Sequence, residues 1–355
     1  MRTKEKISVA LSGGVDSSVA AAILLEEGFE VSGFSLILSD PQAEKDISTA
    51  EECAKFLGIP FETIDLRNEF HREIMKYFID EYRSGRTPNP CIKCNRVIKF
   101  GELLFKRVEK FSGKIATGHY AVIEHDEKNN RFLLKKGFDK KKDQSYFLST
   151  LNQEQLSRVI FPVGKLKKTE VKDLARKLKL PSRNSKESNE LCFIPEGHYS
   201  EYIRETSGLN EKEGNIEHVD GRLLGKHTGI INYTIGQRKG MRIAWSEPLY
   251  VIAIIPDENK VIAGEEKYLY SKRFIVENFF IVNPEYEGKN EFPGEIKIRY
   301  LNDPTPGRVQ LISGNRTEIL LDKAVRAITP GQHACVYSGD VVIGGGTITE
   351  NIKGE

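Results

Sequence analysis

The 355-residue chain is long enough for two or three domains. The chain has 53 Lys and Arg residues and 51 Asp and Glu residues, which gives a net charge of +2. A nucleic acid would therefore have to bind at a local basic patch. The hydrophobic and charged fractions, 39% and 29%, exclude a disordered chain, and no apolar run approaches the roughly 18–20 residues of a membrane helix. The apolar stretch after the charged amino terminus stops at Ser12, which is too short for a signal-peptide core. Five cysteines indicate reduced thiols, so we expect a cytoplasmic protein without membrane association.

The first 118 residues alternate between apolar runs and helical patterns. The apolar runs predict strands over 6–11, 31–38, 61–66 and 114–117. The helical patterns cover 16–27, 42–57, 69–82 and 96–108. Strands that alternate with helices of ten or more residues predict an α/β fold with a doubly wound parallel sheet. Ligands in such sheets bind outside the carboxyl ends of the strands.

The pattern changes in the second half of the chain. Residues 153–180 are helical and basic, and 205–270 consist of short segments separated by glycines. From residue 271 onward there are only strand-like runs, at 274–276, 296–298, 309–311 and 335–337. We therefore predict three domains: an α/β domain over 1–204, a small mixed or β-rich module over 205–270, and a C-terminal β-barrel over 271–355.

A double glycine between serines follows the first predicted strand, in Ser12-Gly13-Gly14-Val15-Asp16-Ser17-Ser18. The glycines allow a tight turn, and the amide groups and helix N-terminus that follow can bind an anion. Ser12 and Ser17 add hydroxyl donors, while Asp16 can hold Mg²⁺ or cap the helix. No lysine follows the glycines as in the P-loop of nucleotide triphosphatases. The sequence therefore predicts a phosphate-binding loop of another kind.

Two of the five cysteines, Cys91 and Cys94, lie in a proline-rich segment over 86–95. Prolines stiffen the backbone, and a rigid loop that carries thiols suits a reactive site. Cys192 is a third candidate, distant in the sequence, whereas Cys53 and Cys335 are predicted to be small core residues. A zinc site would need a second closely spaced pair, which the chain lacks.

The loop at 12–17 resembles the SGGxDS loop of the ATP pyrophosphatase (PP-loop) superfamily. Further motifs follow in the same order as in one of its families, the tRNA-specific 2-thiouridylases of the MnmA type, and this resemblance covers nearly the whole chain. These motifs are 87–95 with Ile98-Lys99-Phe100, 116–121, 142–148, 161–164, 192–194, 227–229 and 233–240.

The resemblance implies an enzyme, a tRNA-uridine 2-sulfurtransferase. It would use ATP and Mg²⁺ to adenylate the C2 oxygen of the wobble uridine in tRNAs for Lys, Glu and Gln, and would replace that oxygen by sulfur from a cysteine persulfide, releasing AMP and pyrophosphate. Adenylation is needed because an amide-like oxygen is a poor leaving group, and a persulfide is a strong nucleophile. The implied partners are tRNA and a sulfur-donor protein of a persulfide relay.

The resemblance also implies that the domain over 1–204 binds the nucleotide and that the central module over 205–270 binds tRNA, and it assigns individual residues. Its nucleotide contacts fall on Ala10, Leu11, Ser12, Gly13, Gly14, Val15, Asp16, Ser17, Leu36 and Gly118. Its tRNA contacts fall on Asn89, Pro90, Cys91, His119, Lys142, Asp143, Gln144, Arg299, Tyr300 and Gln332. Leu36 stands where the family usually has Met, an apolar replacement that should preserve a contact with adenine. Cys91 stands where many members carry Asp, which gives the target-base pocket a third thiol.

Two mechanisms fit the three thiols. In the first, Cys94 and Cys192 are catalytic: Cys192 carries the persulfide and Cys94 resolves it as a disulfide. In the second, Cys91, Cys94 and Cys192 bind a [4Fe–4S] cluster whose fourth iron stays open for the incoming sulfur. We favour the persulfide mechanism, because it needs no metal and uses the pKa-controlled reactivity of thiols.

Two other classes of protein remain compatible with the sequence. One is an adenylating enzyme that activates a carboxylate, such as an amide synthetase, which would not need two separated cysteines. The other is a non-catalytic RNA-binding protein, which the basic segment 163–183 favours with eight Lys or Arg residues against two acidic ones. We expect Lys167, Lys168 and Lys172 in this segment to contact RNA phosphates. Alternatively, Leu166, Leu174 and Leu178 mark the buried face of an ordinary amphipathic helix.

Overall fold

A five-stranded parallel sheet organises the N-terminal part of the computed structural model, which describes residues 4–185, 191–194, 199–208, 211–312 and 314–352. The strand order is β3-β2-β1-β4-β7. The strands are β1 (Lys6–Ala10), β2 (Glu30–Ile37), β3 (Phe61–Asp65), β4 (Ile115–Ala116) and β7 (Val159–Ile160). The order reverses between β1 and β4, so the loops that follow these two strands flank the switch point where ligands bind in such sheets. The doubly wound α/β fold predicted from the sequence is confirmed.

Helices connect the strands of this sheet. They are α1 (Val15–Glu26), α2 (Asp40–Leu57), α3 (Arg67–Phe70), π-helical η1 (His71–Met75), α4 (Lys76–Arg83), α5 (Pro90–Cys94), π-helical η2 (Asn95–Lys99) and α6 (Glu102–Val108). The helix predicted over 69–82 is the continuous run α3-η1-α4, and the one over 96–108 is divided into η2 and α6. The division falls at Gly101, where a Cβ atom would lie 2.0 Å from the Val97 carbonyl oxygen.

The segment between the parallel sheet and the central module is not uniformly helical. It contains the hairpin β5 (Ala121–Asp126) and β6 (Arg131–Lys136), and then α7 (Ser145–Leu148), α8 (Gln153–Ser157), α9 (Lys168–Lys177), η3 (Pro181–Asn184) and α10 (Tyr199–Ser207). The expectation of helix throughout 153–180 is wrong, because β7 lies between α8 and α9. A two-residue strand at the edge of the sheet carries too few residues for a recognisable pattern.

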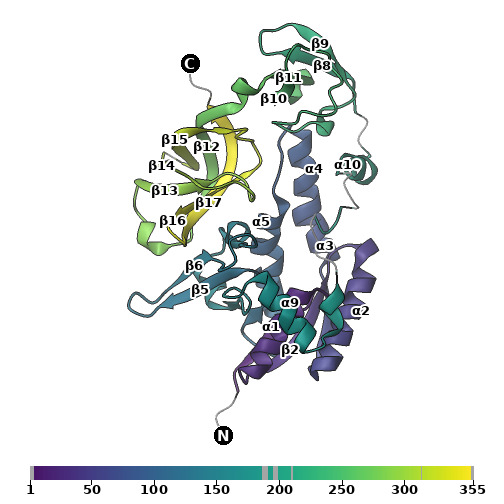
Figure 1. Cartoon of the computed structure of the whole chain (residues 1–355), viewed down its shortest axis with the longest axis vertical. Helices are drawn as coiled ribbons and strands as arrows, with labels where there is room; N and C mark the ends of the chain where they lie inside the picture. The colour runs from purple at the N-terminus through teal and green to yellow at the C-terminus, as the bar shows by residue number, and fades with distance from the viewer. Residues whose placement is uncertain (1–3, 186–190, 195–198, 209–210, 313, 353–355) are drawn as a thin grey trace.

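Two β modules complete the chain (Figure 1). The central module has the sheet order β10-β11-β8-β9, from β8 (Gly214–His218), β9 (Leu223–His227), β10 (Leu249–Ile255) and β11 (Lys260–Glu265). Short 3₁₀ turns lie at η4 (Ile230–Asn232), η5 (Pro256–Glu258), η6 (Glu266–Leu269) and η7 (Pro284–Tyr286).

The C-terminal strands form a closed barrel, as predicted. They are β12 (Tyr270–Ile281), β13 (Glu291–Lys297), β14 (Thr305–Leu311), β15 (Arg316–Arg326), β16 (His333–Ser338) and β17 (Val341–Ile352), and pairing of β12 with β17 closes the ring. The hairpin β5–β6 extends this sheet, because Lys135 pairs with Val341. In Figure 1, α5 lies between the barrel and the parallel sheet.

One apolar core joins the sheet domain to the barrel. It contains Phe34 and Phe70 of the first part, Cys94 of α5, and Cys335 and Tyr337 of β16. Cys53 and Cys335 are both fully buried, which confirms their predicted place in the core. The cysteine helix α5 is therefore held by packing from both sides. None of the helices within the described ranges has the length and apolar character needed to span a membrane.

Candidate active site

The predicted phosphate loop follows β1 and leads into α1. Gly13 has a φ of +71°, and a Cβ atom there would lie 2.4 Å from the Asp46 carbonyl oxygen, so the turn requires glycine. The Ser17 hydroxyl accepts a hydrogen bond from the Ser12 amide at 3.1 Å and lies 3.2 Å from the Ser12 hydroxyl. These contacts close the loop around the N-terminus of a 12-residue helix, an arrangement that attracts anions.

Gly118 lies directly against this loop. A Cβ atom at Gly118 would be 2.7 Å from both the Asp16 carbonyl carbon and the Ser17 nitrogen, so only glycine lets the segment after β4 approach α1 this closely. Leu36, near the end of β2, is half-buried against the core. The structure therefore brings together the loops after β1 and β4, on which the predicted nucleotide contacts lie.

The Asp16 side chain is hydrogen-bonded to other residues of the protein. Its carboxylate accepts hydrogen bonds from Lys168 Nζ at 2.7 Å to each oxygen, and from the Tyr120 hydroxyl at 2.7 Å. Lys168 is the first residue of α9 and is 8% exposed. The expectation that Lys168 contacts RNA phosphates is therefore wrong, because its ammonium group is buried in an ion pair with the phosphate loop.

The remaining basic segment has the character of an amphipathic helix. Val171 and Ala175 are fully buried, and Leu166 and Leu174 pack partly against the same cluster. Leu178 is 40% exposed, so its predicted place on the buried face is wrong. Lys165 and Lys167 are exposed. Only part of this segment is therefore available to a partner.

The two cysteines of the proline-rich segment lie one helical turn apart on α5. Cys94 is buried and Cys91 is half-buried, whereas Cys192 is exposed in the short segment 191–194. Phe193, the next residue, packs edge-on against Phe70 and Phe78 at 5.4 Å each, which anchors the Cys192 segment to the helical run 67–83. The charge of Cys192 influences the pKa values of both Cys91 and Cys94, so the structure brings the three thiols into one electrostatic environment.

Burial controls the acidity of the two helix thiols. It raises the pKa of Cys91 to about 11 and that of Cys94 to about 12, and the nearby Lys99 ammonium opposes both shifts. Burial alone would lower the pKa of Lys99, but the three thiol groups outweigh that effect and its pKa lies above the ordinary value. Lys99 therefore supplies a positive charge to the thiol site. Its motif was noted in the sequence, but without a role.

These shifts predict the order in which the thiols react. At pH 8 we expect iodoacetamide to alkylate exposed Cys192 first, whereas Cys94 should react slowly because little of it is thiolate. Its rate should rise about tenfold per pH unit between pH 8 and 10. Lys99→Met should slow Cys94 further at each pH, because it removes the charge that lowers the Cys94 pKa. Peptide mass spectrometry measures all three rates, and equal rates at pH 8 would contradict the prediction.

The predicted base pocket lies at the start of the cysteine helix. The Asn89 side chain hydrogen bonds to the Tyr146 hydroxyl, and Pro90 is buried. His119 has its Nδ1 2.7 Å from the Thr117 hydroxyl. Burial, with a smaller effect of Lys99, lowers the pKa of His119 to about 3. His119 is thus neutral at physiological pH and can contact RNA only by hydrogen bonding or stacking.

Several residues predicted to contact tRNA make hydrogen bonds within the protein. The buried Asp143 carboxylate accepts from the Gly137 amide at 2.9 Å and from Ser145, so its charge points inward. Gln144 exchanges hydrogen bonds with the Tyr120 backbone at 2.8 and 2.9 Å. These contacts shape the loop that carries Lys142. They argue against direct RNA contact by the Asp143 carboxylate.

Among the barrel residues in this set, Gln332 joins the barrel to the cysteine segment, whereas Arg299 and Tyr300 make other contacts. Gln332 donates to the Thr87 carbonyl at 2.9 Å, and the Thr87 amide donates to the Pro330 carbonyl at 2.9 Å. Arg299 donates to the Ala327 carbonyl and the Thr329 hydroxyl at 2.7 and 2.6 Å. The Tyr300 ring lies 4.6 Å from Phe147. The barrel thus contacts the segment that leads into α5.

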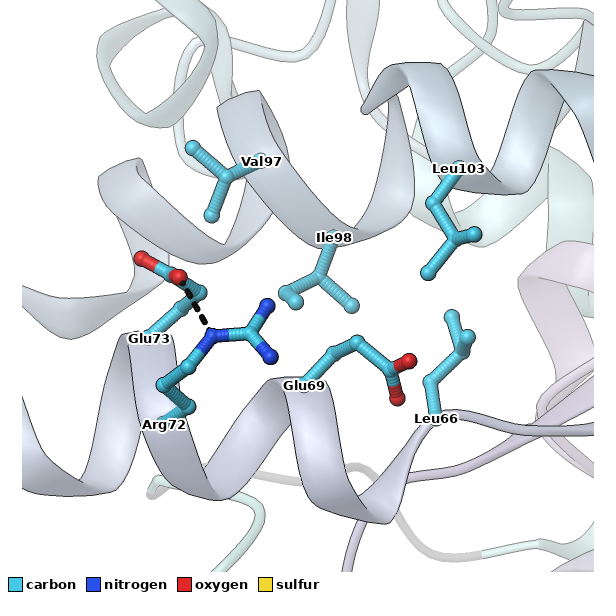
Figure 2. Close-up of a pocket in the computed structure, with 7 residues that line it drawn as sticks. All are labelled: Leu66, Glu69, Arg72, Glu73, Val97, Ile98 and Leu103. Carbon is cyan, nitrogen blue, oxygen red and sulfur yellow. Dashed lines mark hydrogen bonds and ion pairs between the residues drawn. The ribbon is translucent and has the colours of Figure 1, made fainter.

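A separate pocket of about 300 Å³ lies between the run 66–73 and the helices η2 and α6 (Figure 2). It is lined by Leu66, Glu69, Arg72, Glu73, Val97, Ile98 and Leu103. Arg72 donates to Glu73 across its edge at 3.0 Å. None of the predicted site residues lines this pocket, so the pocket is distinct from the predicted active site.

The fold and the site define a class of α/β enzyme: a phosphate-binding loop at the switch point of a parallel sheet, beside a cysteine helix and followed by two β modules. Three family models match the chain in that order. They are described as the tRNA methyl transferase HUP domain over residues 5–196, the tRNA methyl transferase PRC-barrel domain over 202–265, and the aminomethyltransferase beta-barrel domain over 271–348.

Curated relatives match from end to end. The tRNA-specific 2-thiouridylase MnmA of Pelobacter propionicus is 45% identical over 353 residues, covering 98% of each chain. The MnmA 1 protein of Caldanaerobacter subterraneus is 43% identical over 99% of this chain and 100% of its own, and MnmA of Caldicellulosiruptor saccharolyticus is 42% identical over 97% and 98%. The chain belongs to the tRNA-specific 2-thiouridylase (MnmA) family, whose members are tRNA sulfurtransferases. The resemblance stated from the sequence motifs is confirmed.

Proposed function

We propose that the loop over 10–17 binds ATP and Mg²⁺ and directs adenylation of the C2 oxygen of the wobble uridine in tRNAs for Lys, Glu and Gln. The observation that carries this proposal is the close approach of Gly118 to the start of α1, which places the backbone of the segment after β4 against the loop. The amide groups at the N-terminus of α1 would then hold the phosphates. Adenylation releases pyrophosphate and makes the uridine oxygen a leaving group.

We assign the sulfur-transfer step to Cys192 and Cys94. The terminal sulfur of a Cys192 persulfide attacks C2 of the adenylated uridine, and the C2–O bond breaks as AMP leaves with its electron pair. The Cys94 thiolate then attacks the Cys192 sulfur, which breaks the persulfide bond and leaves sulfur on C2. The products are 2-thiouridine and a Cys94–Cys192 disulfide, which a dithiol reductant returns to two thiols.

The exposure of the thiols supports this division of roles. Exposed Cys192 is accessible to a sulfur-donor protein, whereas burial protects Cys94 from dissolved oxidants. In the cluster alternative, Cys91, Cys94 and Cys192 would be the three ligands, and Cys91 and Cys94 lie one turn apart on α5. Reduced thiols also favour a cytoplasmic location.

The test of this function is tRNA-dependent pyrophosphate release together with analysis of the nucleosides. The purified protein, incubated with unmodified tRNA for Lys, Glu or Gln, ATP, Mg²⁺ and a persulfide donor, should release pyrophosphate and form 2-thiouridine. Pyrophosphate without tRNA, or release with tRNA but no thiolated nucleoside in the presence of the donor, would contradict the proposal.

We expect RNA binding to involve the exposed lysines that precede α9. Lys165→Glu and Lys167→Glu should each weaken tRNA binding and reduce the slope of log K against log salt by about one unit. Lys106→Glu, on α6 outside the basic segment, is the matched control and should leave the slope unchanged. Filter binding at several salt concentrations measures the slope. An unchanged slope in both variants would make this segment an ordinary solvated surface.

A further inference from the structure

Three segments that are far apart in the sequence meet at Asp16. Lys168 Nζ bridges both carboxylate oxygens at 2.7 Å, and the Tyr120 hydroxyl donates to one of them at 2.7 Å. Asp16 lies in the first turn of α1, within the phosphate loop. The side chain of Lys168 is only 11% exposed and that of Asp16 is 30% exposed. Through this ion pair, α9 contacts the phosphate loop.

Each partner of Asp16 is itself held in place. The Tyr120 backbone exchanges two hydrogen bonds with Gln144, at 2.9 and 2.8 Å. The Lys168 amide donates to Asp139 Oδ2 at 2.9 Å, which fixes the start of α9. The Lys168 ammonium also lies 5.7 Å from the centre of the Tyr120 ring. The carboxylate therefore meets a preorganised cation and hydroxyl, not a flexible surface lysine.

This ion pair is a costly way to stabilise a fold, because the Lys168 ammonium loses most of its hydration and the partly exposed Asp16 carboxylate loses some of its own. Val171 and Ala175 already attach α9 to its apolar cluster, so the pair is not needed to dock the helix. Its position at the phosphate loop indicates a role there. Asp16 lies two residues after Gly14, and a Cβ atom at Gly118 would lie 2.8 Å from the Asp16 Cβ, so a shift of Asp16 would disturb a closely packed part of the loop backbone.

We propose that Lys168 is a positioning residue of the ATP site: by holding Asp16 from α9, it keeps the phosphate loop in the conformation that accepts ATP. This role rests on the proposed function, since it requires that the loop bind ATP. It separates Lys168 from the neighbouring lysines, which face solvent. Loss of the ammonium group should weaken ATP binding and leave tRNA binding unchanged.

Binding of a non-hydrolysable ATP analogue with Mg²⁺, measured by calorimetry on the full chain, tests this role. Lys168→Met should weaken binding at least about tenfold, because Asp16 loses its charged partner. Lys168→Arg, which can pair with both carboxylate oxygens, should restore most of the affinity. Tyr120→Phe should have a smaller effect, and Lys177→Met, exposed at the C-terminal end of α9, should have none.

Folding and RNA binding are measured on the same proteins. If Lys168→Met lowers the melting temperature, the charge-free pair Asp16→Asn with Lys168→Met should recover stability without recovering ATP affinity. ATP affinity equal to wild type in Lys168→Met would overturn the proposal, as would a loss of tRNA affinity with ATP binding intact. If the wild-type protein itself binds no ATP, the proposed function fails as well, whereas normal binding by both proteins rejects the Lys168 role alone.

Discussion

Replacement of Cys94 or Cys192 by serine is expected to reduce 2-thiouridine formation at least about 1,000-fold, while Cys91→Ser should keep most of the activity. Serine preserves the size of each side chain but cannot carry a persulfide or form a disulfide. Cys91 shares α5 with Cys94, so it serves as a control for the local effect of the substitution. Adenylation needs no thiol, so all three variants should still release pyrophosphate with tRNA.

The same variants distinguish the two sulfur-transfer mechanisms. With a persulfide, the protein purified without oxygen should be colourless and mass spectrometry should detect the added sulfur on Cys192. A brown protein whose visible absorbance is lost in Cys91→Ser, Cys94→Ser and Cys192→Ser alike would reject the persulfide mechanism in favour of the cluster. Cys53→Ala, in the core of the sheet domain, is the control for loss of a thiol elsewhere.

Asp16→Asn should lower tRNA-dependent pyrophosphate release at least about 100-fold while tRNA affinity stays near wild type. Asparagine retains the shape of the side chain but removes the charge that Lys168 holds and that Mg²⁺ would need. Alanine is a poorer choice, since it leaves the buried Lys168 ammonium unpaired, which typically costs about 3–5 kcal/mol of stability.

A pyrophosphate assay and a filter-binding assay on the same preparation check this expectation. Glu26→Gln, exposed at the far end of α1, is the matched control and should release pyrophosphate at the wild-type rate. A wild-type rate in Asp16→Asn would mean that the loop does not act on the phosphates, whereas equal losses of release and of tRNA affinity would indicate a general structural defect.

Most of the fold was predicted from local sequence patterns. β1, β2 and β3 have five to eight residues each, enough to show a strand-like pattern, and the glycines between β1 and α1 predicted the phosphate loop. The two-residue strand β7 was not predicted, because its pairing with β4 defines it more than its own residues do. The hairpin β5–β6 was also not predicted, although its two strands pair with each other.

By itself, the sequence determined the chemistry that this chain carries: the parallel-sheet domain, the serine and glycine loop, three candidate reactive thiols, and membership of the 2-thiouridylase family. Only the tertiary structure decided which polar side chains face the site. Lys168 pairs with Asp16 across 152 positions, and Asp143 and Gln332 make hydrogen bonds within the protein. The physical reason is that a motif specifies its own backbone, whereas the partner of a buried charge depends on which distant segments pack around it.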